Sequence, residues 1–107
     1  MLAKILKNGG ATINARGEFV QLKTGYQVSV RDLGRIKTAD LTEKMVRDVI
    51  EQGLQRGEYC GVWIDDGFAY VDISKRIKTK QEAMRLGREK KQLSILDWRK
   101  NECLAVV

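Results

Sequence analysis

The side chains of this chain that could perform chemistry are few, and their types narrow the chemistry that is open to it. There is no histidine, so the chain lacks the commonest general base and any Ser-His or Cys-His nucleophile pair. The two cysteines, Cys60 and Cys103, are far apart in the sequence, and neither has a second cysteine nearby. We therefore expect reduced, packed thiols in an intracellular protein and no zinc site.

Carboxylates are the remaining candidates for acid–base or metal chemistry. Asp65, Asp66 and Asp72 form the nearest cluster, and their oxygens are ligands that magnesium prefers. However, Asp66 precedes Gly67 in a dipeptide typical of a tight hairpin turn, and Asp72 lies most of a strand length away from that turn. We therefore expect no catalytic residue, no metal site and no cofactor, and we predict that the chain is not an enzyme.

The charge of the chain is concentrated in residues 75–91, which we call the basic segment. Its eight cations outnumber two acids, Glu82 and Glu89, and this excess equals the whole formal charge of +6. The cations are Lys75, Arg76, Lys78, Lys80, Arg85, Arg88, Lys90 and Lys91. A compact patch of one sign steers association with acidic molecules, so these residues are our candidate partner-binding site. The alternative is a solvated helix face without a partner.

A β-hairpin is predicted at residues 59–73, where two apolar stretches flank the turn dipeptide Asp66-Gly67. A two-residue turn sets Trp63 opposite Tyr70 on one side of the hairpin. The other side is wholly apolar and is expected to face the core; it carries Cys60, Val62, Ile64, Ala69, Val71 and Ile73.

The aromatic side of this hairpin, with Trp63, Phe68 and Tyr70, is a secondary candidate surface. Such residues can stack nucleic-acid bases on a sheet, or they can form a protein-binding hot spot. The third interpretation is a second small core, covered by an N-terminal hairpin and by the strand that begins at Tyr26. We favour this covered arrangement, because an uncovered aromatic face of that size is unusual for a monomer.

A first helix is predicted over about residues 41–55 from its apolar periodicity. Asp40 is the expected N-cap, and Glu43 stands at the position that completes a capping box. Gly57 is the expected end of this helix. Its charged residues pair with one another at i,i+4 spacing, so we interpret this helix as structural.

A second helix is predicted over about residues 80–90, inside the basic segment. Thr79 and Glu82 have capping-box spacing, with Thr79 as the N-cap. Gly87 costs the helix about 1 kcal/mol relative to alanine, which indicates close packing of the backbone against a sheet.

The remaining segments are β-prone, and together with the two helices they define the fold class. The expected strands are residues 11–14 paired with 19–22, residues 26–30, residues 93–98 and an edge strand at 103–106, while 31–38 is left open. The order strand–helix–strand around the second helix implies a parallel crossover. We predict one α+β domain, residues 1–107: a mixed, mainly antiparallel sheet of five to seven strands with two helices packed on one face.

The sequence gives no sign of a membrane segment. No apolar run approaches the roughly 20 residues of a membrane span. Residues 1–7 are too short and too interrupted by lysine for a signal-peptide core. We expect a cytoplasmic protein with no membrane partner.

Three stretches carry a resemblance to a known group of proteins. They are residues 61–74 (GVWIDDGFAYVDIS), 81–88 (QEAMRLGR) and 92–98 (QLSILDW), with residues 24–29 (TGYQVS) upstream. The chain resembles small accessory proteins of bacterial mobile elements and phages. The resemblance implies an anti-defence role, such as that of anti-CRISPR inhibitors, which are typically small, non-enzymatic and act by occupying an effector. It carries over no site residue.

Two functions are therefore expected, and they differ in partner. The first is a protein-binding inhibitor or modulator that blocks a type II CRISPR nuclease complex through the basic segment, where it could also touch the guide RNA. The second is a nucleic-acid-binding accessory protein that contacts phosphates without sequence preference. The partner's identity, the oligomeric state and the covered sheet face stay open at this point.

Overall fold

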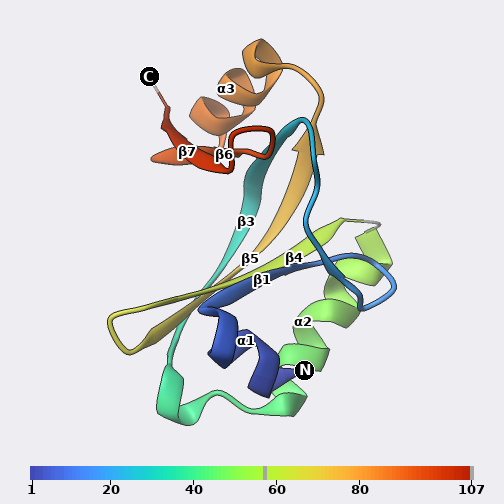
Figure 1. Cartoon of the computed structure of the whole chain (residues 1–107), viewed down its shortest axis with the longest axis vertical. Helices are drawn as coiled ribbons and strands as arrows, with labels where there is room; N and C mark the ends of the chain where they lie inside the picture. The colour runs from blue at the N-terminus through green and yellow to red at the C-terminus, as the bar shows by residue number, and fades with distance from the viewer. Residues whose placement is uncertain (57, 107) are drawn as a thin grey trace. The chain divides into compact units, whose positions relative to one another are not determined.

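The computed structural model describes residues 1–56 and 58–106, with the side chains of 54–56 outside the description (Figure 1). The helices are α1 (Leu2–Asn8), α2 (Glu43–Arg56) and α3 (Lys80–Glu89), with a 3-10 turn, η1 (Thr38–Asp40). The strands are β1 (Gly10–Ile13), β2 (Phe19–Val20), β3 (Tyr26–Lys37), β4 (Tyr59–Asp65), β5 (Phe68–Ile77), β6 (Ser94–Asp97) and β7 (Glu102–Ala105). The expected helix end at Gly57 lies outside the described residues.

The strands form one antiparallel sheet with the order β2-β1-β4-β5-β3-β6-β7. The α+β fold class is thereby confirmed. β6 pairs with β3 rather than with β5. Because β3 lies antiparallel between them, β5 and β6 run parallel to each other without sharing hydrogen bonds. The crossover through α3 therefore spans one intervening strand.

The contacts within the chain group it into two compact units. The first unit comprises Met1–Val20 and Asp32–Ile73, and the second comprises Gln21–Arg31 and Ser74–Val107. The long strands β3 and β5 contribute to both units. The single domain over residues 1–107 stays a prediction. The packing of both expected helices on one face of the sheet also stays a prediction, since α2 and α3 belong to different units.

Helix α2 packs on the apolar side of the first unit. Its buried residues include Val46 and Ile50, and β4 and β5 supply Val62 and Val71. The expected cap at Asp40 is wrong, because Asp40 lies in η1 and the Thr42 hydroxyl instead accepts a hydrogen bond from the Met45 backbone N–H at 3.2 Å.

Helix α1 is an element that the sequence reasoning missed. Its buried residue is Ile5, and Gly9 ends it in the left-handed conformation. The Glu43 carboxylate binds the amino group of Met1 at 3.1 Å and accepts the Leu2 backbone N–H. These contacts lower the pKa of Glu43, the hydrogen bond from the amino group being the main cause. Glu43 therefore holds α1 instead of completing a capping box.

The hairpin of β4 and β5 forms as predicted. Asp66 and Gly67 both have positive φ, 47° and 79°, which defines a type I′ turn. A Cβ added at Gly61 would fall against the Asp72 carboxylate, as expected if these two residues lie opposite each other. The predicted core side is buried at Cys60, Val62, Ala69, Val71 and Ile73.

The second unit has its own small core beneath α3. Val28, Ala83 and Ile95 are buried there, and the partly buried Tyr26, Ile77, Met84, Leu86, Leu104 and Val106 pack against them. On β3, the neighbouring Gln27 is buried and links two other side chains: it accepts from Trp98 Nε1 at 2.9 Å and donates to Ser74 Oγ at 2.8 Å. These two hydrogen bonds connect the turn after β6 to β3 and β5.

Candidate binding surfaces

The basic segment lies entirely in the second unit. Lys75 and Arg76 lie near the end of β5, Lys78 lies in the following connection, and the other five cations lie on α3 or directly after it. All eight side chains are exposed. In the part of the chain that the structure describes, no ion pair is found for Lys78, Lys80, Arg85, Lys90 and Lys91. These five cations are therefore available to an external anion.

Arg76 has a structural role inside the unit. Its Nε donates to the Thr24 carbonyl at 2.9 Å, and its Nη2 donates to Thr24 Oγ1 at 2.8 Å. The guanidinium lies over Gly25, where a Cβ would come within 3.0 Å of it. Gly25 also has a positive φ of 87°, so this close approach needs glycine. Arg76 fixes the loop before β3.

Helix α3 presents both signs of charge on its exposed side. Thr79 Oγ1 accepts the Glu82 N–H at 3.3 Å, which confirms the predicted cap. Gly87 packs as expected, because a Cβ there would lie 3.0 Å from Val106 and 3.2 Å from Ile95. Arg85 follows Glu82 by three residues and precedes Glu89 by four, so both acids lie on its side of the helix.

The fold adds further cations to the second unit. Lys23, Arg31, Arg99 and Lys100 lie outside the basic segment but inside this unit, and all four are exposed. The unit has twelve basic and four acidic residues, a formal charge of +8, whereas the first unit has eight basic and ten acidic residues. Sequence reasoning missed these four residues because they come from separate segments. No contiguous charge window contains them.

The aromatic side of the hairpin is exposed in the first unit. Trp63 retains 66% of its accessible surface and Tyr70 retains 40%. The expected cover over this face is wrong. The N-terminal hairpin is part of the sheet itself, since β1 pairs with β4 and Gly10 lies directly opposite Trp63. A strand that pairs at the edge of a sheet extends the faces of that sheet and does not cover them.

Phe68 has a partner that the sequence reasoning did not find. The guanidinium of Arg35 lies over the Phe68 ring, 4.3 Å from its centroid. Arg35 comes from β3, so it lies near the aromatic residues of the hairpin only after folding. Trp63, Phe68, Tyr70 and Arg35 together form what we call the aromatic surface.

The carboxylate cluster does not assemble into a metal site. Asp66 lies in the type I′ turn, and Asp72 lies against Gly61 farther along the hairpin. Over residues 1–56 and 58–106, no group of three His, Cys, Asp or Glu side chains could hold a metal ion. The absence of catalytic residues and cofactors stays a prediction.

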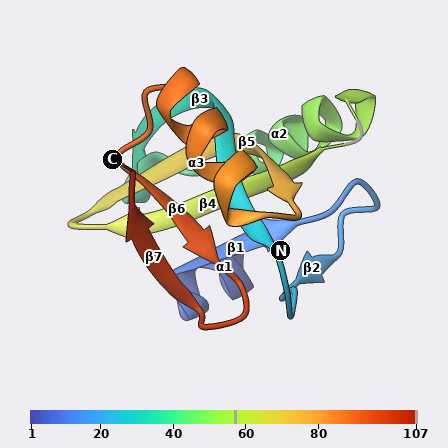
Figure 2. The same ribbon diagram turned by 90° about the horizontal axis from the view of Figure 1, so that it is seen from above.

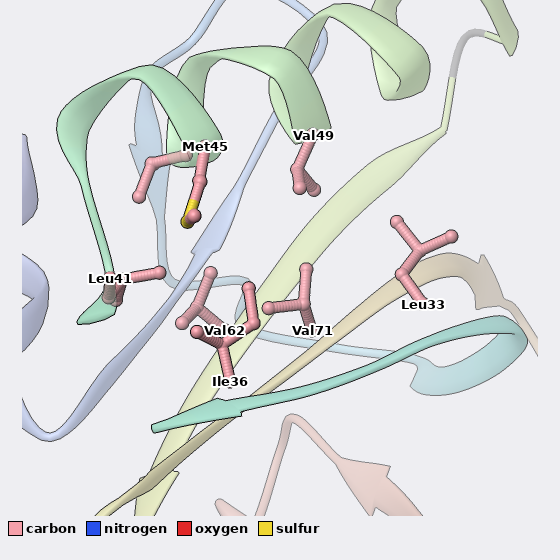
Figure 3. Close-up of a pocket in the computed structure, with 8 residues that line it drawn as sticks. Leu33, Ile36, Leu41, Met45, Val49, Val62 and Val71 are labelled. Carbon is pink, nitrogen blue, oxygen red and sulfur yellow. The ribbon is translucent and has the colours of Figure 1, made fainter. Parts of the chain in front are cut away.

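An apolar cavity of about 70 Å³ lies between α2 and the sheet (Figure 3). It is lined by Leu33, Ile36, Leu41, Met45, Val46, Val49, Val62 and Val71. Leu33 and Ile36 are three residues apart on β3, and Gly34 between them has a positive φ of 91°, which breaks the regular alternation of sides. Because ligand pockets usually measure about 300–1,000 Å³ and contain polar groups, we interpret this cavity as imperfect packing.

Comparison of the chain with models of protein families, with curated proteins and with solved structures finds no match. The resemblance to accessory proteins of mobile elements therefore stays a hypothesis based on the sequence. Along the described residues, no helix is long and apolar enough to cross a membrane.

Proposed function

We propose that this chain is a non-enzymatic binding protein that inhibits or modulates an acidic macromolecular partner. The observation that carries the proposal is the segregation of charge, with a formal charge of +8 in the second unit. Cations from separate sequence segments belong to one compact unit. Such a concentration of one sign raises association rates with acidic surfaces.

Two features favour a partner that contains protein over bare nucleic acid. The exposed side of α3 carries Glu82 and Glu89 beside Arg85, and this mixture of both signs complements a protein surface better than a phosphate backbone, which is negative throughout. The aromatic surface offers exposed tryptophan, tyrosine and arginine, the residue types in which the binding energy of protein interfaces is concentrated. A partner with both protein and nucleic-acid surfaces fits both units.

Within this proposal, the partner is an effector complex of a bacterial defence system, and the chain is an anti-CRISPR protein that blocks a type II CRISPR nuclease. The resemblance to accessory proteins of mobile elements supports this choice, and a cytoplasmic location is part of the same proposal. The guide RNA bound in such a complex is a further acidic surface for the second unit.

The test is inhibition of DNA cleavage by purified type II nuclease–guide complexes, combined with co-purification. We expect the wild-type chain to bind and inhibit, and reversal of Arg85, Arg88 and Lys91 to glutamate to reduce inhibition at least tenfold. Reversal of Lys44 and Arg47, exposed cations of α2 in the first unit, is the control and should have little effect. If the wild-type chain neither binds nor inhibits any nuclease complex tested, the proposal is wrong.

The alternative function is nonspecific nucleic-acid binding, which the uncommitted cations of the second unit favour. If about five phosphates are neutralised, the logarithm of the binding constant should fall with the logarithm of salt concentration at a slope near about −4.5. Anisotropy titrations with duplex DNA, single-stranded DNA and structured RNA measure that slope. Sub-micromolar binding to all three at physiological salt would favour this alternative, and binding lost well below that salt would reject it.

A further inference from the structure

Strand β7 is an edge strand and lies beside β6 (Figure 2). Its pairing with β6 determines which of its backbone groups are free. The Val106 N–H donates to the Leu93 carbonyl at 2.9 Å, and the register then sets Leu104 opposite Ile95 and Cys103 opposite Leu96. Hydrogen-bonded and non-hydrogen-bonded pairs alternate in an antiparallel ladder. The N–H and C=O groups of Cys103 and Ala105 therefore point away from β6, towards the free edge.

Nothing among the described residues occupies this free edge. In the described part of the chain, β6 is the strand that pairs with β7, and Cys103 and Ala105 are both exposed. Natural edge strands are usually protected by proline, lysine, a bulge or a covering segment. Residues 102–105 contain no proline or lysine, their register with β6 is continuous, and Glu102 at the start of the strand is their one charged residue. This edge can thus accept another strand.

The charges at the two ends of β7 indicate the chemistry of the occupant. Arg99 and Lys100 lie in the turn that leads into β7. At the other end, Lys90 and Lys91 closely precede Leu93, whose carbonyl pairs with Val106 beyond the strand. All four cations are exposed. The ends of an added strand would therefore lie towards these four cations, which outnumber Glu102, the single acid of β7.

A second copy of the chain fits this edge poorly. Pairing of β7 with its own copy would bring two units of formal charge +8 against each other, and like charges at short range oppose association. An acidic segment gains from the same cations. The main-chain bonds would supply affinity without a sequence requirement, as in other cases of strand addition.

We propose that the free edge of β7 binds an extended, acidic peptide segment of the partner protein as an eighth strand. This inference rests on the proposed function, because it takes the partner to contain protein. It assigns the main-chain groups of Cys103 and Ala105 to binding, and Arg99, Lys100, Lys90 and Lys91 to the choice of an acidic segment.

The experiment uses a synthetic octapeptide of alternating glutamate and valine, with a lysine–valine octapeptide as the charge control. We expect the acidic peptide to bind and to slow amide hydrogen exchange at Cys103 and Ala105 by at least tenfold. The Ala105→Pro variant removes one outward N–H without removing a bond to β6, so its affinity should fall at least tenfold. Ala105→Val keeps that N–H and should bind like the wild type.

A peptide with N-methyl groups on one edge tests the same bonds without changing the protein, in case Ala105→Pro disturbs folding. Equal binding of the methylated and unmethylated peptides would overturn the inference. So would unchanged exchange at Cys103 and Ala105, or protection of both amides by self-association without peptide.

The nuclease assay separates this inference from the proposed function. If Ala105→Pro folds and inhibits as well as the wild type, the edge is not the binding site but the inhibitor function stands. If the wild-type chain inhibits no nuclease yet binds the acidic peptide at this edge, the edge site stands and the proposed target is wrong.

Discussion

Trp63 is the residue on which the proposed contact of the first unit depends most. Its ring is largely exposed, so Trp63→Ala should change the free energy of unfolding by no more than about 0.5 kcal/mol. If the aromatic surface is a hot spot, the same change should weaken partner binding by about 2 kcal/mol or more, roughly thirtyfold. Denaturant unfolding and a binding titration measure the two effects.

Leu93 provides the matched control for this prediction. It is a large apolar residue with 90% of its surface exposed, but it belongs to the second unit and is not part of the aromatic surface. Leu93→Ala should leave affinity within a factor of three. Equal losses for both variants would mean that the aromatic surface has no special role.

The two thiols should differ strongly in reactivity. Cys60 is buried and donates to the Val49 carbonyl at 3.0 Å, and burial is the main cause that raises its pKa to about 11. Cys103 is exposed. At pH 8, a thiol reagent such as Ellman's reagent should therefore label one thiol quickly and the second only after unfolding. Cys103→Ser should abolish the fast phase, and a persistent fast phase would contradict the assignment.

The raised pKa of Cys60 also predicts how stability depends on pH. The folded state binds the thiol proton of Cys60 more tightly than the unfolded state does. The resulting contribution to the free energy of unfolding is complete below pH 9.0, the ordinary pKa of a cysteine, and is lost as the pH rises towards about 11. The loss should be about 2–3 kcal/mol across that window. Comparison of the wild type with Cys60→Ala by urea unfolding at several pH values isolates it, since other titrating groups are common to both proteins.

At the residue scale, the sequence predicted which side chains are exposed better than it predicted which side chains contact each other. The basic segment is exposed as expected, because charged side chains seldom lie buried without a partner. By contrast, the hydrogen bonds from Arg76 to Thr24 and the stacking of Arg35 on Phe68 join residues that are distant in sequence. Such pairs depend on how β3 and β5 align, and no local pattern encodes that alignment.

Among the elements, α2 makes a contact with β4 that needs glycine. A Cβ at Gly53 would overlap the Sγ of Cys60. Gly53→Ala should therefore destabilise the protein by about 1–3 kcal/mol, although alanine is the better helix former. The double variant Gly53→Ala, Cys60→Ala removes the overlap and should recover much of the loss. A double-mutant cycle with additive effects would refute this contact.

The cavity beneath α2 offers a second test of packing. Val49→Ile adds one methylene towards a space that already exists, so it should stabilise the protein by up to about 1 kcal/mol. The control is Val28→Ile, at a fully buried position of the second unit, which should destabilise through overpacking. Chemical denaturation of both variants gives the comparison, and the same sign of effect in both would contradict it.

Element prediction succeeded where local signals were strong. The Asp66-Gly67 turn and the Thr79 cap are as expected, since each depends on residues within a few positions. The failures have physical reasons as well. Helix α1 has only seven residues and depends on the burial of Ile5 and on its ties to Glu43. The cap of α2 is Thr42 because η1 already uses Asp40.

For the whole molecule, the uneven charge predicts an unusual response to salt. Repulsion within the second unit should make stability rise with added salt between about 20 and 200 mM, since screening weakens interactions between exposed charges. Reversal of Lys90 and Lys91 to glutamate should reduce this rise. Reversal of Lys44 and Arg47 in the first unit gives the same net charge but should increase it, because that unit is already slightly acidic. Equal responses of both variants in thermal melts would mean that only total charge matters.

The short length of α3 has a consequence for any attempt to copy this surface. The helix has ten residues and contains a glycine, and isolated helices shorter than about 12–15 residues are marginal in water. Its buried side needs Ile95 and Val106, which lie beyond the basic segment. A synthetic peptide of residues 75–91 would keep the eight cations and lose their arrangement. A useful mimetic would therefore need a covalent staple along the helix, or the strands on which α3 rests.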